Sequence, residues 1–222
     1  GDYNLKSLHL GAEIPAIILV AIGYEVENEL ESMVVRTRDL TPSIDAVQAE
    51  IMWNAPPPFT LPENISPGGA GEFLEFINNE LKPVINSRYR ADPTDQTLAG
   101  YSFGGLFSLF TLFNHPNSFD RYVIGSPSIW WHDQVSFDYE EQYAQAHSDL
   151  AKTVYISVGE LEEPPGSESY GMVSNAREMD RRLSARGYPN LQLEYVVFDG
   201  ETHMSGPGVS INRGLKAVFA ND

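Results

Sequence analysis

A serine with glycines two residues away on each side is the first candidate for chemistry. Gly100-Tyr101-Ser102-Phe103-Gly104 matches the G-x-S-x-G pattern, in which a tight turn between a strand and a helix exposes the serine hydroxyl and requires small flanking residues. The N–H of Phe103 would stabilise an oxyanion near the positive end of that helix. The alternative is a glycine-rich turn with an incidental serine. The pattern favours Ser102 as a nucleophile, which still needs a base to activate it.

One histidine among the five in the chain has the position that such a base requires. In α/β-hydrolases the order along the chain is nucleophile, acid, then histidine on the loop after the last strand. His203, in "VVFDGETHMSG", lies a few residues past the last expected strand. We therefore predict His203 as the general base. His132 is a second candidate for substrate contact, but not for the base.

An acid should follow an intervening strand and hold the imidazole in the correct tautomer. The stretch "TVYISVGELEE" supplies that strand and three carboxylates, Glu160, Glu162 and Glu163. Their spacing does not choose among them. Asp199 lies close to His203 in sequence, but it leaves the strand before it, and we interpret it as a turn residue.

Strands and helices alternate along the chain, which predicts an α/β fold with a mostly parallel sheet and helices on both faces. The expected strands cover 16–23, 96–99, 121–125, 153–158 and 191–198. The expected helices cover 72–85, 103–113, 135–150, 172–186 and 209–219, with a kink at Pro83. Pro and Gly predict an irregular segment over 45–71, and Trp53 and Phe59 within it favour a lid. The whole of 1–222 is expected to form one domain.

Composition excludes several classes of function. The formal net charge of −17 argues against nucleic acid and anionic membrane partners. The absence of cysteine excludes disulfides and thiolate metal sites. The longest apolar run, "IPAIILVAIGY", is too short to span a bilayer. No motif for a metal or an organic cofactor is present. We expect a soluble protein without cofactor, and both the cytoplasm and the periplasm stay open as its location.

Several stretches together carry a family resemblance: "RTRDLTP", "LAGYSFGGLFSLF", "FDRYVIGSPSIWW", "YISVGELE" and "RRLSARGYPNLQLEYVVFDGETHMS". From about Ile14 to its end, the chain resembles the esterase family of α/β-hydrolases that holds esterase D-like enzymes, feruloyl esterases, mycolyltransferases and siderophore esterases. It is most similar to the siderophore-esterase branch. The resemblance implies Ser102 as nucleophile and His203 as base. It also implies Glu162 as the acid, third after the glycine that closes its strand.

The resemblance further suggests substrate contacts. Trp130 and Trp131 would line the acyl or aromatic part of a substrate, with core packing as the alternative. Arg38 would meet an anionic substrate, or would pair with Asp39 to hold its loop. We also place Tyr101, beside the nucleophile, among the substrate-contacting residues.

The chain departs from the family pattern at its start. It begins at "GDYNLKS", where family members have further strands, so we expect the N-terminal strands to be reduced or missing. The second oxyanion N–H normally comes from that region, which makes Asp2 a candidate donor. A homodimer across the open sheet edge would complete such a short form. A fragment is the other explanation.

These observations predict a serine carboxylesterase that hydrolyses small ester substrates through an acyl-enzyme. The lid segment has few aliphatic residues, so we expect short acyl chains to be preferred. A siderophore trilactone esterase and an acyltransferase would use the same site. A non-catalytic binding protein on a hydrolase scaffold is the alternative from another class.

Overall fold

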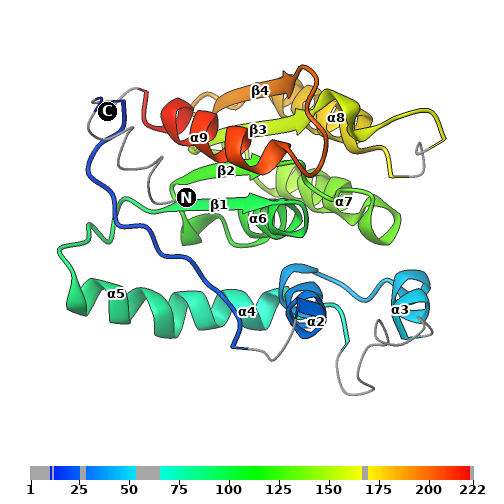
Figure 1. Cartoon of the computed structure of the whole chain (residues 1–222). Helices are drawn as coiled ribbons and strands as arrows, with labels where there is room; N and C mark the ends of the chain where they lie inside the picture. The colour runs from blue at the N-terminus through cyan, green and yellow to red at the C-terminus, as the bar shows by residue number, and fades with distance from the viewer. Residues whose placement is uncertain (1–10, 12, 26–28, 54–65, 167–169, 221–222) are drawn as a thin grey trace. The chain divides into compact units, whose positions relative to one another are not determined.

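The structure, a computed structural model, describes residues 11, 13–25, 29–53, 66–166 and 170–220 (Figure 1). The chain divides into two compact units. One unit comprises the described parts of 1–18, 92–130 and 134–222 and holds the sheet. The other comprises those of 19–91 and 131–133 and is helical. The single domain over 1–222 stays a prediction.

The sheet has four parallel strands in the order β1-β2-β3-β4 among the described residues. They are β1 (Thr97–Tyr101), β2 (Arg121–Gly125), β3 (Thr153–Gly159) and β4 (Gln192–Phe198). Strands β2 and β3 are buried along nearly their whole length, as expected for inner strands covered on both faces. The predicted α/β class is thereby confirmed, and the four strands differ from the predicted ranges by at most two residues at an end.

Helices cover both faces of this sheet. They are α6 (Phe103–Asn114), α7 (Trp131–Ala146), α8 (Met172–Arg186) and α9 (Gly206–Val218), with short turns η2 (Pro116–Ser118) and η3 (Glu160–Glu162). Figure 1 shows α9 in front of the strands and α8 behind them. Each helix follows a strand, so every strand's carboxyl end leads into a loop at the same sheet edge. Side chains from these loops can therefore meet.

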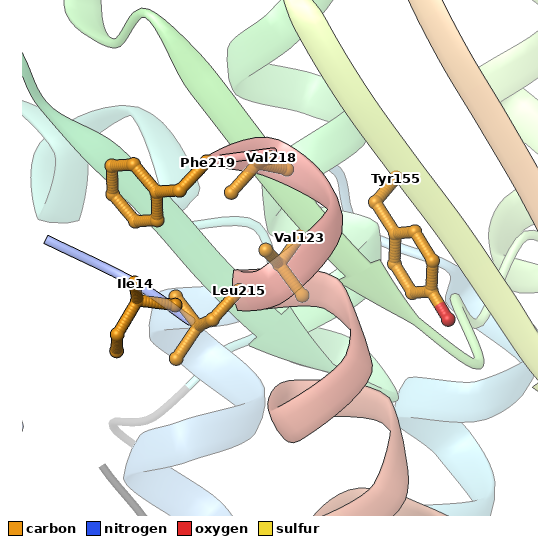
Figure 2. Packing of buried hydrophobic residues seen from close by; sticks show 6 residues of the cluster. All are labelled: Ile14, Val123, Tyr155, Leu215, Val218 and Phe219. Carbon is orange, nitrogen blue, oxygen red and sulfur yellow. The ribbon is translucent and has the colours of Figure 1, made fainter. Parts of the chain in front are cut away.

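The core under α9 fixes that helix on the sheet. Leu215 and Val218 pack with Val123 of β2 and Tyr155 of β3, and Ile14 joins them from the N-terminal segment (Figure 2). All of these side chains are less than one tenth exposed. Burial of each large apolar side chain contributes about 1.5–3 kcal/mol. The loop between β4 and α9 is thus held at both ends.

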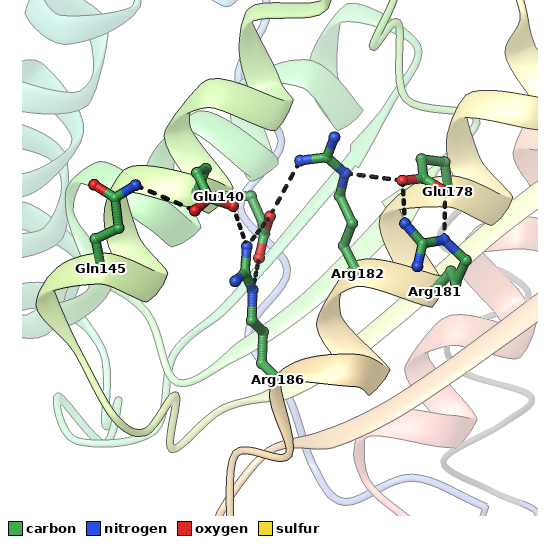
Figure 3. Close-up of polar contacts among 7 residues, drawn as sticks. Glu140, Gln145, Glu178, Arg181, Arg182 and Arg186 are labelled. Atoms are coloured by element: carbon green, nitrogen blue, oxygen red, sulfur yellow. Dashed lines mark hydrogen bonds and ion pairs between the residues drawn. The ribbon is translucent and has the colours of Figure 1, made fainter.

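A charged network joins α7 to α8 (Figure 3). The side chain of Glu140 on α7 is fully buried, and Arg186 of α8 binds both of its oxygens at 2.8 and 3.1 Å. Arg182 lies 3.6 Å from the same carboxylate and also binds Glu178. A buried carboxylate needs such partners, because an unpaired one would be strongly destabilising.

The helical unit contains α2 (Glu29–Leu40), α3 (Ala46–Trp53), α4 (Ala70–Phe76), the π-helical turn η1 (Ile77–Leu81) and α5 (Lys82–Arg88). Figure 1 shows α4 and α5 as one continuous run. The Lys82 N–H donates to the Ile77 carbonyl, five residues back, directly before Pro83. The predicted helix over 72–85 is confirmed, and a π turn stands next to the proline that was expected to kink it.

The predicted irregular segment over 45–71 is wrong at both ends. Residues 46–53 form α3, whose N-terminus is capped by Asp45, because its Oδ1 accepts hydrogen bonds from the N–H groups of Val47 and Gln48. The other end, Ala70 and Gly71, belongs to α4. Four of the five prolines that disfavour regular structure lie within 54–65, outside the described residues, as does Phe59; the fifth, Pro67, lies in the irregular stretch before α4. The lid stays a prediction.

The strand predicted over 16–23 is also wrong. The segment is extended but pairs with no strand among the described residues. Ile18, Leu19, Val20 and Ile22 are 40–57% exposed. A strand forms only where neighbouring backbone supplies hydrogen-bond partners, so β-branched composition alone does not produce one.

In the described part of the chain, no helix is both long and apolar enough to cross a membrane.

Candidate active site

Ser102 occupies a strained turn between β1 and α6. Its backbone has φ 61° and ψ −118°, and its N–H donates to the Gly125 carbonyl at 3.0 Å. A residue with a side chain rarely adopts positive φ, and such strain is typical of functional sites. The turn is so tight that a Cβ on Gly100 would overlap the Gly104 carbonyl and lie 2.8 Å from Ser108 Oγ. A Cβ on Gly104 itself would meet nothing within 4 Å among the described residues, so of these two glycines only Gly100 is required by close contact.

His203 faces Ser102 from the loop between β4 and α9. Its Nε2 lies 3.1 Å from Ser102 Oγ, and its Nδ1 lies 2.6 Å from Glu162 Oε2. The imidazole side chain is 40% exposed, so one side of it is open to a substrate or to water. A neutral imidazole with Nδ1–H donated to the carboxylate presents an unprotonated Nε2 to the hydroxyl. This geometry suits proton transfer from the serine.

The structure also selects one carboxylate among the three candidates. Glu162 binds His203, whereas Glu160 accepts from the Gly200 N–H and Glu163 accepts from Ser174. The Glu162 side chain is fully buried. Burial raises the pKa of this carboxyl, but hydrogen bonds from His203, Ser126 and the Gly159 N–H outweigh it and lower that pKa below its usual range. Glu162 is therefore ionised at neutral pH.

The start of α6 lies beside Ser102. Phe103 is its first residue, where helix N–H groups and the positive end of the helix dipole face an incoming anion. The predicted second donor, Asp2, lies outside the described residues. Sequence reasoning missed Ser128, a buried residue whose Oγ lies 3.4 Å from Ser102 Oγ. It lies in "SPSIWW", two residues from the tryptophan pair that drew attention to that loop.

Aromatic side chains form a wall next to the helix start. The Phe103 and Trp130 ring centroids are 6.0 Å apart, and Trp130 meets Tyr170 edge to face at 5.1 Å. Trp130 is half-buried and Tyr170 is exposed, so both present ring surface. Substrate contact by Trp130 stays a prediction. No motif in the sequence pointed to Tyr170 as part of this surface.

Two residues predicted as substrate contacts have protein partners in the structure. Trp131 is only 1% exposed, and its indole N–H donates to the Ser43 carbonyl, so it is a packing residue. The Tyr101 hydroxyl donates to the His203 carbonyl at 3.0 Å and lies 3.4 Å from Glu162 Oε1, so it helps to hold the histidine loop; substrate contact by Tyr101 stays a prediction. Both residues are engaged with protein because buried polar atoms need partners.

Two further candidates belong to the helical unit. Arg38 Nε binds Asp39 at 2.6 Å, which is the loop-holding pair that the sequence offered as an alternative. His132 has its Nδ1 2.8 Å from Ser43 Oγ. Substrate contact by either residue stays a prediction.

Within the described residues, no group of three His, Cys, Asp or Glu side chains is placed to hold a metal ion.

Comparisons with known proteins agree with this fold. The family model described as "Putative esterase" matches residues 22–205. Ferri-bacillibactin esterase BesA of Bacillus subtilis is 34% identical over 211 residues, which cover 94% of this chain and 69% of that protein. The crystal structure of BES protein from Bacillus cereus has a TM-score of 0.77 at 30% identity, over 96% of this chain and 76% of that one. Siderophore hydrolase EstA from Aspergillus nidulans has a TM-score of 0.79 at 27% identity, over 96% and 75%.

The fold, the order of Ser102, Glu162 and His203 along the chain, and these similarities lead to one assignment. The family model matches most of the chain, and one relative is more than 30% identical to it. These similarities show membership of a family and not only a shared fold. The chain belongs to the "Putative esterase" family of α/β-hydrolases, in its siderophore-esterase-like branch, and is a carboxylic ester hydrolase.

Proposed function

We propose that Ser102 is the nucleophile, His203 the general base and Glu162 the acid that orients it. The observation that carries the proposal is the unbroken relay from Ser102 Oγ to His203 Nε2 at 3.1 Å, and from His203 Nδ1 to Glu162 at 2.6 Å. Serine is a weak nucleophile unless an adjacent base takes its proton. The buried, ionised carboxylate stabilises the imidazolium that forms when His203 does so.

The reaction then follows in two halves. Ser102 Oγ attacks the ester carbonyl carbon, and His203 transfers the serine proton to the departing alkoxide, which leaves as an alcohol. Phe103 N–H stabilises the negative charge on the carbonyl oxygen in the tetrahedral intermediate. In the second half, His203 takes a proton from water, the hydroxide attacks the acyl-enzyme, and Ser102 recovers its proton as the acid is released.

We propose siderophore esters as the substrate class. Two of the proteins described above are named for ferri-bacillibactin and siderophore hydrolysis. The wall of Phe103, Trp130 and Tyr170 supports this class, because flat aromatic groups pack well against such rings. A small aliphatic ester would leave most of that surface uncovered.

The experiment is hydrolysis of a ferric trilactone siderophore and of p-nitrophenyl acetate by the wild type and by Ser102→Ala, with products resolved by chromatography. We expect ring-opened siderophore from the wild type only, with a higher kcat/KM than for p-nitrophenyl acetate. An intact siderophore alongside rapid p-nitrophenyl acetate hydrolysis would refute the substrate class but not the mechanism. Equal activity of Ser102→Ala would refute the mechanism. An added alcohol that captures most of the acyl group would assign acyl transfer instead of hydrolysis.

A further inference from the structure

The acid of the relay has two oxygens with separate partners. Glu162 Oε2 faces His203 Nδ1 at 2.6 Å. Oε1 accepts from Ser126 Oγ at 2.6 Å and from the Gly159 N–H at 2.7 Å, and the Tyr101 hydroxyl donates to it over a longer distance of 3.4 Å. The carboxylate side chain is fully buried, so it needs these donors to offset the loss of water. The contact from Ser126 is short, as is typical of a hydroxyl bound to a charged oxygen.

Ser126 is built into an unusual backbone position. It follows β2 directly, its N–H donates to the Ser157 carbonyl at 2.7 Å, and it is 1% exposed. Its φ of 39° is uncommon for a residue other than glycine. Packing alone does not require a hydroxyl here, because alanine would fill nearly the same space. The hydroxyl's partner is Glu162, which points to a role in holding that carboxylate.

Gly159 supplies the backbone N–H that also binds Oε1 of Glu162. A Cβ at this position would lie 2.9 Å from Glu162 Oε1 and 2.5 Å from the Glu201 carbonyl oxygen. Both separations are too short for a real Cβ, so glycine is what lets the carboxylate reach the N–H at the end of β3. The two donors come from the carboxyl ends of neighbouring strands, which are rigid platforms for a side chain.

We propose that Ser126 is a positioning residue: together with the Gly159 N–H, its hydroxyl fixes Oε1 of Glu162 and so turns Oε2 toward His203 Nδ1. The inference rests on the proposed function, since the orientation matters only if His203 is the base. Ser126 does not touch the reacting atoms. Its effect must therefore pass through Glu162, and this makes it measurable by a double-mutant cycle.

The experiment measures kcat and KM for p-nitrophenyl acetate in the wild type, Ser126→Ala, Glu162→Ala and the double variant. We expect Ser126→Ala to lower kcat about tenfold with KM within about twofold, because one hydrogen bond to a charged group is lost. In the Glu162→Ala background the same substitution should change kcat by less than about twofold. Equal losses in both backgrounds, or no loss in the first, would overturn the proposal.

Two further variants control for backbone strain at Ser126 and for the loss of any buried serine hydroxyl. Ser126→Gly removes the same hydroxyl but tolerates positive φ, so it should reproduce the loss even where Ser126→Ala folds poorly. Recovery of wild-type kcat in Ser126→Gly would assign the effect to backbone strain and overturn the proposal. Ser136→Ala is the matched control, a buried serine whose hydroxyl has no partner among the described residues; its kcat should be unchanged.

Labelling by an organophosphonate separates this inference from the proposed function. If the folded wild type forms no adduct at Ser102, the mechanism fails and the positioning role fails with it. If the adduct forms and Ser126→Ala behaves as wild type, only the positioning role is refuted.

Discussion

A methyl group added to the nucleophile turn provides a sensitive test of its geometry. In Gly100→Ala the new Cβ would overlap the Gly104 carbonyl oxygen and press on Ser108 Oγ at 2.8 Å. The carbonyl is backbone and cannot rotate away, so the start of α6 must move by about 1 Å, and Ser102 moves with it. A displacement of that size is enough to cost about 10²-fold in rate. This corresponds to about 2.7 kcal/mol of lost transition-state stabilisation.

The assay is the kcat/KM for p-nitrophenyl acetate, normalised by active-site titration and compared with the thermal midpoint of each variant. Gly104→Ala is the matched control, because its Cβ meets nothing within 4 Å in the described part of the chain and alanine favours the helix that begins there. We expect it to keep wild-type activity. If Gly100→Ala retains wild-type kcat/KM while folded, the tight-turn argument is refuted.

Three other predictions follow from the described contacts. Arg186→Met should lower the free energy of unfolding by about 3 kcal/mol in urea titration, because it strips both close contacts from the buried Glu140. Arg181→Ala, at an exposed pair with Glu178, should cost less than about 1 kcal/mol; a similar loss in both variants would contradict the account. The lowered pKa of Glu162 stabilises the fold above its ordinary value of 4.5, and this contribution is lost as pH falls through the lower native value. Wild-type stability should therefore fall more steeply than that of Glu162→Gln below about pH 4.5, and parallel curves would contradict this. Among p-nitrophenyl esters, acetate should be hydrolysed faster than long-chain esters, and the reverse order would refute the preference for short acyl chains.

The site could be predicted from the sequence as far as order along the chain decides it. Ser102 and His203 each occupy a position that the hydrolase topology defines, so motif and order were sufficient to predict that their side chains meet. The choice of Glu162 over its neighbours depends on which carboxylate the η3 turn directs inward, and spacing alone left that open. Ser126 and Ser128 carry no motif of their own. They meet the site only because parallel strands end at one sheet edge.

The fold shows the same division between local and non-local information. The helix over 172–186 was predicted to the residue, because its apolar stripe and the left-handed Gly187 after it are local signals. The strand over 16–23 failed because pairing depends on partners elsewhere in the chain. For Trp131 the residue type alone does not tell a packed indole from an exposed one, and its burial fits the packing alternative. The N-terminus of α3 was overlooked, although Asp45 before a helix-forming stretch is a recognisable cap.

The central claim is that Ser102 is a nucleophile activated by His203. Its most direct test is intact-mass and peptide analysis of the folded protein after treatment with a fluorophosphonate, for the wild type and for His203→Ala. The account predicts one adduct per chain, located on Ser102, with a rate that falls at least about 10²-fold in His203→Ala because the serine loses its base. An adduct on another residue, no adduct in the folded wild type, or an unchanged rate in His203→Ala would contradict it.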